Sequence, residues 1–303
     1  MRAIRFHGAG DLRLEEVPRP EPAEGDVLVR VEVALTDGTD LKTYRRGHPR
    51  LLSSLPSPFG HEFCGLHVET GHRVVAANSD ADDDRRPGEL LNGAYAEFLL
   101  VPEAIARVNL HRVPPGLAPE VAAMVEPLAC CLRGVELAGV EAGQTVAILG
   151  AGPIGLMLSA CVADAGGWPV VVGGRPERRA LVPLFGAEPG DGEGADVAIE
   201  AAGTEQAWQD AIALVRPRGT VLLFGGLEAG TLVPVDATRV HYDELTLRGA
   251  FHHTPRHVRA ALAFLASGAY PWEELVTHRV GLDGLPALFR DPPRDLLKAA
   301  VLP

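Results

Sequence analysis

The stretch of sequence that decides the fold runs Thr145-Val146-Ala147-Ile148-Leu149-Gly150-Ala151-Gly152-Pro153-Ile154-Gly155. Its first five residues form a short apolar run of the kind found in buried strands, and three glycines follow at the spacing Gly-x-Gly-x-x-Gly. Beyond the glycines, apolar residues recur at the spacing of one helix face: Ile154, Leu158, Cys161 and Ala165. The pattern predicts a strand, a tight turn and a helix, which together open a βαβ unit.

Each glycine of this turn has a separate physical role. Gly150 allows the tight turn, Gly152 lets the backbone approach a pyrophosphate, and Gly155 lets the helix pack closely on the strand. Pro153 and Ile154 begin the helix, whose free N–H groups and positive dipole end favour phosphate. An ordinary strand-to-helix turn is the alternative. A second apolar run in the expected place favours dinucleotide binding.

The end of that second run predicts which dinucleotide binds. NAD-selective units carry a carboxylate there, about 20 residues after the first glycine, to hold the ribose 2′-hydroxyl. This chain has Gly173-Gly174-Arg175 instead. No carboxylate repels a 2′-phosphate, and the planar fork of Arg175 can pair with one. The sequence predicts NADP, with NAD as the second choice; the alternative for Arg175 is a solvated turn residue.

The two halves of the chain differ in their patterns. In the second half, apolar runs alternate with helical segments, which predicts a parallel sheet covered by helices. The runs are Val146–Leu149, Val170–Val172, Val197–Ile199 and Val221–Phe224. The first hundred residues instead predict strands and turns, and a helical stretch is expected from Pro119 to about Leu137.

The predicted fold class is α/β, with a doubly wound parallel-sheet (Rossmann) cofactor domain and a mainly β, barrel-like catalytic domain. A chain of 303 residues exceeds the size at which one core keeps growing. The predicted boundaries are residues 1–130 for the first part of the catalytic domain, 131–251 for the cofactor domain, and 252–303 for the return to the catalytic domain.

Charge and cysteine content exclude several classes of function. The net charge is −12 and no basic cluster occurs, which argues against binding to nucleic acid or to an anionic membrane. No signal segment and no apolar run of membrane-spanning length is visible. The four cysteines lack the paired spacings of a structural zinc site or of a disulfide framework. We expect a cytoplasmic protein with small-molecule partners.

Three polar segments of the first half carry candidate metal ligands. They are Asp37-Gly38-Thr39-Asp40-Leu41-Lys42, Gly60-His61-Glu62, and Glu126 in Val125-Glu126-Pro127-Leu128-Ala129. Carboxylates and imidazole bind divalent metals. Taken singly each segment is ordinary, since a His-Glu pair is commonly a surface feature and a Glu before Pro commonly begins a helix.

The order of these segments ahead of the glycine turn resembles the zinc-dependent medium-chain alcohol and polyol dehydrogenases, including the sorbitol and threonine dehydrogenase branch. In that family the three segments normally read Cys-Gly-Thr-Asp, Gly-His-Glu and Glu-Pro-Leu-Ala. Asn92–Glu97 and His278–Val280 also resemble family landmarks, so the likeness covers nearly the whole chain. It implies a GroES-like catalytic domain, an alcohol or ketone substrate, and a homodimer or homotetramer.

The resemblance also implies residue roles. His61 would be a metal ligand, Glu62 a ligand or its close neighbour, and Glu126 the residue at the remaining ligand position. Thr39 would relay the substrate proton, Asp40 would support the site by hydrogen bonding, and Lys42 stands where some relatives have a relay histidine.

Two departures from the family pattern bear on metal binding. Asp37 stands where the family has a cysteine ligand, and the lobe that normally holds a structural zinc is reduced to the acidic, cysteine-free residues 78–92, which predicts no structural zinc. A carboxylate has the charge of a thiolate, and zinc–oxygen distances of about 2.0–2.2 Å are close to the roughly 2.3 Å of zinc–sulfur. An oxygen-rich site selects zinc less strongly. We expect one catalytic divalent metal, zinc first, at Asp37.

The reaction that these expectations support is reversible oxidation of a secondary alcohol or polyol by hydride transfer to NAD(P). One alternative is a metal-free quinone or enone reductase that uses NADPH, against which His61, Glu62 and Glu126 argue. Another is a non-catalytic sensor of nicotinamide dinucleotides, against which the retention of Thr39 argues.

Overall fold

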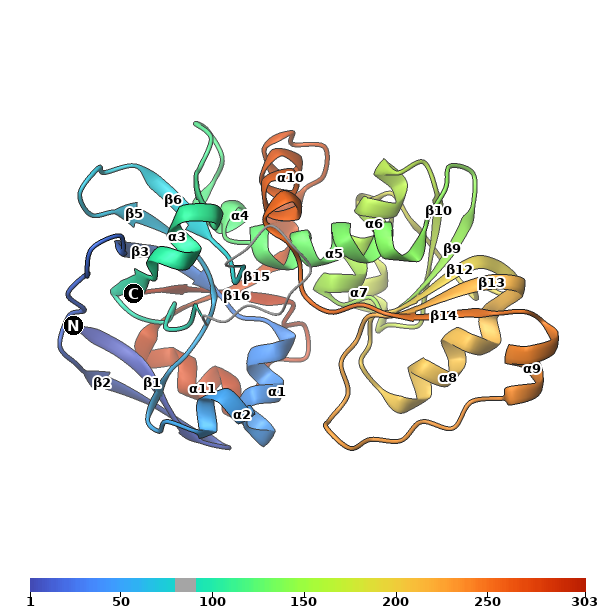
Figure 1. Cartoon of the computed structure of the whole chain (residues 1–303), viewed down its shortest axis with the longest axis horizontal. Coiled ribbons are helices and arrows are strands. Elements are labelled where there is room, and N and C mark those ends of the chain that lie inside the picture. The colour runs from blue at the N-terminus through green and yellow to red at the C-terminus, as the bar shows by residue number, and fades with distance from the viewer. Residues whose placement is uncertain (80–90) are drawn as a thin grey trace. The chain divides into compact units, whose positions relative to one another are not determined.

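The computed structural model describes residues 1–79 and 91–303 (Figure 1). The chain forms two compact units. The first unit comprises residues 1–127 and 253–303, and the second comprises residues 128–252. No helix within the described residues is long and apolar enough to cross a membrane.

The second unit is an α/β sandwich. Its strands are β9 (Thr145–Leu149), β10 (Trp168–Val172), β11 (Glu188–Gly190), β12 (Ala195–Glu200), β13 (Val215–Leu223) and β14 (Thr246–Gly249). Its helices are α6 (Pro153–Asp164), α7 (Pro176–Arg179), α8 (Glu205–Leu214) and α9 (Ala237–Tyr242), with α5 (Val125–Ala138) leading into it and a 3₁₀ turn at Val182–Phe185.

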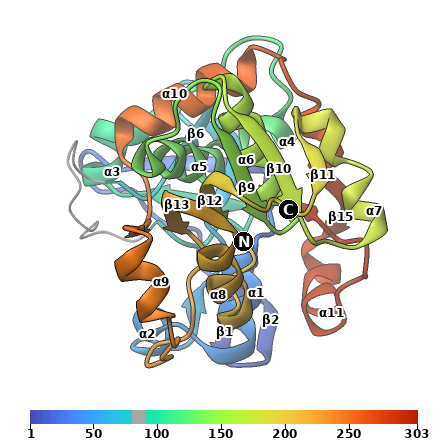
Figure 2. The same ribbon diagram turned by 90° about the vertical axis from the view of Figure 1, so that its right-hand side faces the viewer.

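All neighbouring strands of the second unit are parallel, in the order β11-β10-β9-β12-β13-β14. Helices α6 and α8 cover opposite faces of this sheet (Figures 1 and 2). Strand β9 lies in the interior of the sheet, and Val146, Ala147 and Ile148 are completely buried. Burial on both faces explains why the central strands are continuous apolar runs. The doubly wound fold is therefore confirmed.

The glycine turn joins β9 to α6 as the sequence predicts. Gly150 has a φ of +117°, a conformation that favours glycine. A Cβ atom at Gly155 would lie 1.8 Å from the carbonyl oxygen of Gly150, so only glycine lets α6 approach the end of β9 this closely. Gly152 precedes the helix at its N-cap position, and an added Cβ there would meet no atom within 4 Å. The backbone at Gly152 therefore faces open space.

The first unit is mainly antiparallel β-structure. Its strands are β1 (Arg2–Gly8), β2 (Asp11–Glu16), β3 (Val27–Leu35), β4 (Ser57–Pro58), β5 (Glu62–His67), β6 (Arg73–Ala76), β7 (Phe98–Val101), β8 (Leu110–Arg112), β15 (Val276–Gly281) and β16 (Lys298–Leu302). Its helices are α1 (Gly38–Arg46), α2 (Pro49–Leu52), α3 (Glu103–Asn109), α4 (Pro119–Ala122), α10 (Pro255–Ala266) and α11 (Leu285–Arg290), with 3₁₀ turns at Trp272–Leu275 and Leu282–Gly284.

Two sheets build this unit. The larger has the order β15-β16-β3-β5-β6-β8 with β7 also paired to β3, and the smaller has the order β2-β1-β4. Strand β16 pairs with β3 and β15, so a segment close to residue 300 completes a sheet begun by residues 27–35. The mainly β catalytic domain is thus confirmed as a fold.

An aromatic cluster fills the core of the first unit. Phe59 stacks on Phe6 with ring centroids 5.5 Å apart, and lies 5.8 Å from Tyr95 and 5.9 Å from Phe289. Tyr44 of α1 meets Phe289 edge-on at 5.7 Å. This cluster holds the segment just before His61 and the helix just after Asp37 in one core.

The helical stretch expected from Pro119 to about Leu137 consists of two helices, α4 and α5. The reason is Pro127. Proline lacks the N–H that would bond back to residue 123 and its ring clashes with that carbonyl, so it is tolerated only in a first turn. A new helix therefore begins at Val125.

Candidate functional site

Asp37 occupies the N-cap of α1. Its backbone is extended (φ −136°, ψ 177°), and its Oδ1 accepts a hydrogen bond of 2.7 Å from the backbone N–H of Asp40. This satisfies one of the N–H groups left open at a helix start. The second oxygen, Oδ2, lies 3.9 Å from Nε2 of His61. One carboxylate thus caps a helix and faces an imidazole.

His61 lies between two carboxylates. Its Nε2 faces Asp37, and its Nδ1 lies 3.4 Å from Oδ1 of Asp40. Donor atoms of these three residues all lie within 4.8 Å of one another. Burial opposes protonation of the ring, but Asp37, Asp40 and the more distant charge of Glu126 outweigh it and hold the pKa of His61 well above its usual value. The site attracts positive charge.

This arrangement fits a divalent cation. Two ligands at about 2.0–2.2 Å from a tetrahedral ion are roughly 3.4 Å apart. The 3.9 Å between Oδ2 of Asp37 and Nε2 of His61 is close to that value and too long for a direct hydrogen bond. Asp40 meanwhile lies on the Nδ1 side, where a carboxylate fixes the tautomer and orientation of a metal-binding histidine.

Asp40 is itself held by other groups. It is buried, and one of its oxygens accepts a hydrogen bond from the hydroxyl of Tyr95. Burial and the charge of Asp37 raise the pKa of Asp40, while His61 and Tyr95 act in the opposite direction. Asp40 therefore lies between the imidazole of His61 and the hydroxyl of Tyr95.

Glu62 does not share the partners of its neighbour His61, because its carboxylate bonds to Lys298. Both of its carboxylate oxygens accept hydrogen bonds from Nζ of Lys298, at 2.7 and 2.8 Å, and the two side chains are almost completely buried. Burial opposes the charge on Lys298, yet Glu62 and Asp37 hold the pKa of Lys298 above its usual value. In this structure Glu62 therefore directs both carboxylate oxygens at Lys298.

Glu126 lies outside the group formed by Asp37, Asp40 and His61. It is buried near the start of α5, and its Oε1 lies 3.5 Å from Nε2 of His253. Nδ1 of that histidine is 2.8 Å from the hydroxyl oxygen of Ser79. In this structure Glu126 therefore faces His253.

Thr39 and Lys42 belong to the first turns of α1. Thr39 is exposed two residues after Asp37, and Lys42 is half-buried one turn further on. Both residues therefore belong to the helix that Asp37 caps. The acidic, cysteine-free segment 78–92 lies largely outside the described residues, which resume at residue 91.

The candidate cofactor residues lie at the carboxyl ends of β9 and β10. Gly173 and Gly174 both have positive φ, and Arg175 precedes α7 as its N-cap. Sequence reasoning missed Arg178 on the same helix. Burial and the charge of Arg175 lower the pKa of Arg178, so this short segment carries two arginines that sense each other's charge. Such a pair favours an anion.

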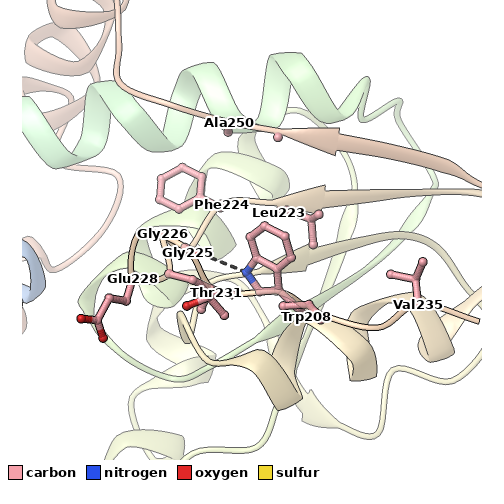
Figure 3. A pocket seen from close by; sticks show the side chains of 12 residues that line it. Trp208, Leu223, Phe224, Gly225, Gly226, Glu228, Thr231, Val235 and Ala250 are labelled. Atoms are coloured by element: carbon pink, nitrogen blue, oxygen red, sulfur yellow. Dashed lines mark hydrogen bonds between the residues drawn. The ribbon is translucent and has the colours of Figure 1, made fainter.

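A pocket of about 440 Å³ lies at the carboxyl ends of β13 and β14 (Figure 3). Trp208 of α8 and Phe224 line it, and Nε1 of Trp208 donates a 3.0 Å hydrogen bond to the carbonyl of Gly225 (Figure 3). The buried carboxylate of Glu200 accepts hydrogen bonds from the backbone N–H groups of Gly203 and Gly225. Ligands of doubly wound sheets bind at this edge.

Comparisons with known proteins agree with both units. Residues 23–115 match the model of the alcohol dehydrogenase GroES-like domain, and residues 188–267 match that of zinc-binding dehydrogenases. The chain is 30% identical to erythritol/L-threitol dehydrogenase of Mycolicibacterium smegmatis, covering 93% of this chain and 91% of that protein.

Two solved structures are similar over their whole length. One is described as a zinc-binding dehydrogenase from Sinorhizobium meliloti 1021 bound to NADP, with a TM-score of 0.89, 30% identity, and coverage of 100% of this chain and 99% of that one. The other is 2R,3R-butanediol dehydrogenase from Bacillus subtilis, with a TM-score of 0.88, 26% identity and the same coverage.

Proposed function

The chain belongs to the zinc-type medium-chain alcohol and polyol dehydrogenases, and from this we propose that it oxidises a secondary alcohol of the polyol or diol kind. It is an NAD(P)-dependent oxidoreductase acting on CH–OH groups. The observation that carries the proposal is the pair formed by Asp37 and His61, whose Oδ2 and Nε2 face each other across 3.9 Å. A diol substrate agrees with the names of the similar proteins.

We propose that Asp37 and His61 hold one divalent metal, with Glu126 as the third protein ligand after it turns from His253. When bound, the metal polarises the substrate oxygen and so lowers the pKa of the alcohol. Asp40 accepts the Nδ1–H of His61 and keeps Nε2 directed at the site. The hydroxyl of Thr39 passes the alcohol proton outward. Lys298 keeps Glu62 away from the metal by occupying both of its oxygens.

Turnover of a panel of polyols, diols and secondary alcohols tests this reaction. With added zinc or manganese we expect alcohol-dependent formation of reduced cofactor. Thr39→Val should lower kcat by about 10²–10⁴-fold, the usual contribution of general acid–base catalysis. Cofactor affinity should stay unchanged. Reduction of enones or quinones alone would favour the metal-free reductase, and cofactor binding without any turnover would favour the sensor.

We propose that NADP is preferred over NAD. Arg175 and Arg178 bring two guanidinium groups to the segment that follows β10. NAD-selective units have a carboxylate at the end of this strand, whereas this chain has Gly173 there. A charge-assisted contact to a 2′-phosphate contributes about 1.5–3 kcal/mol. Arg175→Ala and Arg178→Ala should each weaken NADP binding and leave NAD binding nearly unchanged, as titrated by fluorescence.

Arg179→Ala on the same short helix is the matched control and should bind both cofactors as the wild type does. A wild type that binds NAD more tightly than NADP would reverse the proposal.

We also propose an oligomeric state, a metal content and a cellular location for the protein. The resemblance supports a homodimer or homotetramer, which sedimentation can test. The absence of a structural zinc follows from the cysteine-free segment 78–92, and one metal per chain is the expected content. A cytoplasmic location is supported by the four cysteines, none of which forms a disulfide.

A further inference from the structure

Tyr95 lies at the centre of the first unit and is completely buried. Its backbone N–H donates to the carbonyl of Phe59 at 3.1 Å, and its carbonyl accepts from Ile4 at 2.8 Å. Its ring lies against Phe59 and meets Phe289 edge-on, with ring centroids 5.8 and 6.4 Å away. The backbone hydrogen bonds and the ring contacts therefore fix Tyr95 in a single position.

The hydroxyl of Tyr95 bonds to a residue of the cation site. It donates to Oδ2 of Asp40 and also lies 3.0 Å from the carbonyl oxygen of Leu35. A hydroxyl has one proton to donate, and an ionised carboxylate is the stronger acceptor. Asp40 then receives the proton of Tyr95 on one oxygen and faces Nδ1 of His61 with the other.

The ring of Tyr95 also touches the segment that carries His61. A Cβ atom at Gly60 would lie 2.6 Å from Cδ2 of Tyr95, so the ring packs directly on the backbone before His61. Tyr95 thus contacts the two segments that carry the proposed ligands, the start of α1 through its hydroxyl and residues 59–60 through its ring and backbone.

We propose that Tyr95 is a positioning residue of the metal site. Its hydroxyl fixes the carboxylate of Asp40, Asp40 fixes the imidazole of His61, and Nε2 of His61 is then held toward Asp37 before the metal arrives. The inference rests on the proposed metal function. It adds to the site a residue that the sequence motifs around the proposed ligands do not indicate.

Tyr95→Phe tests the hydroxyl alone, because it keeps the ring. Zinc affinity is measured by competition with a chromophoric chelator, without any turnover. Partners outside the ligand shell change metal affinity by about 10–100-fold, and we expect about tenfold weaker zinc binding, the lower end of that range. Tyr44→Phe is the matched control, because Tyr44 is a buried tyrosine of the same core and packs on the same Phe289. It should bind zinc as the wild type does.

A double-mutant cycle separates positioning from general loosening of the core. If Tyr95 acts through Asp40, adding Tyr95→Phe to Asp40→Asn should weaken zinc binding by less than twofold beyond Asp40→Asn alone. Equal zinc affinity of wild type and Tyr95→Phe, or additive losses in the cycle, would overturn the role of Tyr95 while leaving the metal site in place. A wild type that binds no divalent metal would overturn the metal site and this inference together.

Discussion

At the scale of single residues, Asp37 combines two functions that a thiol cannot combine. One carboxylate oxygen accepts from the backbone at the start of α1, and the other faces His61. A cysteine supplies a good zinc ligand but only a weak hydrogen-bond acceptor. Asp37 therefore caps the helix better than a cysteine would, and in its proposed role as a metal ligand it would select zinc less strongly.

Two substitutions of Asp37 should separate these functions. Asn keeps the capping oxygen, so Asp37→Asn should retain the helix cap but lose most of its zinc affinity. Asp37→Cys should bind zinc more tightly, yet its metal-free form should be less stable by about 1 kcal/mol because the cap is lost. Urea unfolding with chelator and zinc competition measure the two effects. Undiminished zinc binding by Asp37→Asn would contradict the assignment of Asp37 as a ligand.

The buried pair of Glu62 and Lys298 should matter strongly for stability. Removing one partner of such a pair leaves an uncompensated charge and costs about 3–5 kcal/mol. Lys298→Met should lower the free energy of unfolding by this amount, and Glu62→Leu combined with Lys298→Met should recover most of it. Lys42→Met, which changes the only other lysine of the chain, is the control. Urea titration gives the values; a single variant as stable as the double one would show that the pair is not ionised.

Residue roles were predictable only where a short motif carries them. The motifs around Asp37 and His61 predicted two groups that the structure does bring together. Lys298 was missed because its partner is 236 residues away and nothing in its own neighbourhood indicates a site. Tyr95 was seen only as part of a family landmark, since its contact with Asp40 depends on tertiary packing.

At the scale of elements, burial explains which strands could be predicted. Strands β9 and β12 are apolar because helices cover both faces. Edge strands β11 and β14 escaped notice because they carry exposed residues such as Glu188 and Arg248 in short segments. The break between α4 and α5 also escaped, although Pro127 is visible in the sequence.

At the start of β12, the carboxylate of Asp196 forms hydrogen bonds to both neighbouring strands. Oδ2 of Asp196 accepts from the N–H of Thr145 at the start of β9, and Oδ1 accepts from Arg216 of β13. Although burial acts to raise it, these hydrogen bonds hold the pKa of Asp196 below its usual value. A carboxylate with a lowered pKa contributes stability above its unfolded pKa, and this is lost as pH falls through the folded pKa.

Asp196→Asn should therefore destabilise the protein at pH 7, by about 0.2–1 kcal/mol for a partly exposed pair. At pH 3 the deficit of the variant should be smaller than at pH 7, because the carboxyl group of Asp196 begins to be protonated. Asp210→Asn is the control, because Asp210 of α8 accepts from the uncharged Gln206. Calorimetry at both pH values measures the differences; a deficit that persists unchanged at pH 3 would exclude the charge of Asp196 as its cause.

At the scale of the whole molecule, the chain forms the first unit from two separate segments. Residues 1–127 provide Asp37, His61 and Glu126, whereas residues 253–303 provide His253 and Lys298. The second unit is one continuous segment, residues 128–252. The sequence prediction of a return to the first domain after residue 251 was based on a helical segment and short strands that no longer follow the alternating α/β pattern.

The position of β16 has a consequence for the order in which the protein folds on the ribosome. Domains generally fold as units during synthesis, from the N-terminus onward. Residues 128–252 emerge before β16, so the second unit can complete its sheet early. The first unit must wait, with the edge of β3 at Ala34 and Leu35 unpaired and Glu62 lacking its ammonium partner. The first unit therefore completes its sheet last, and until β16 is made the unpaired edge of β3 can pair with another chain.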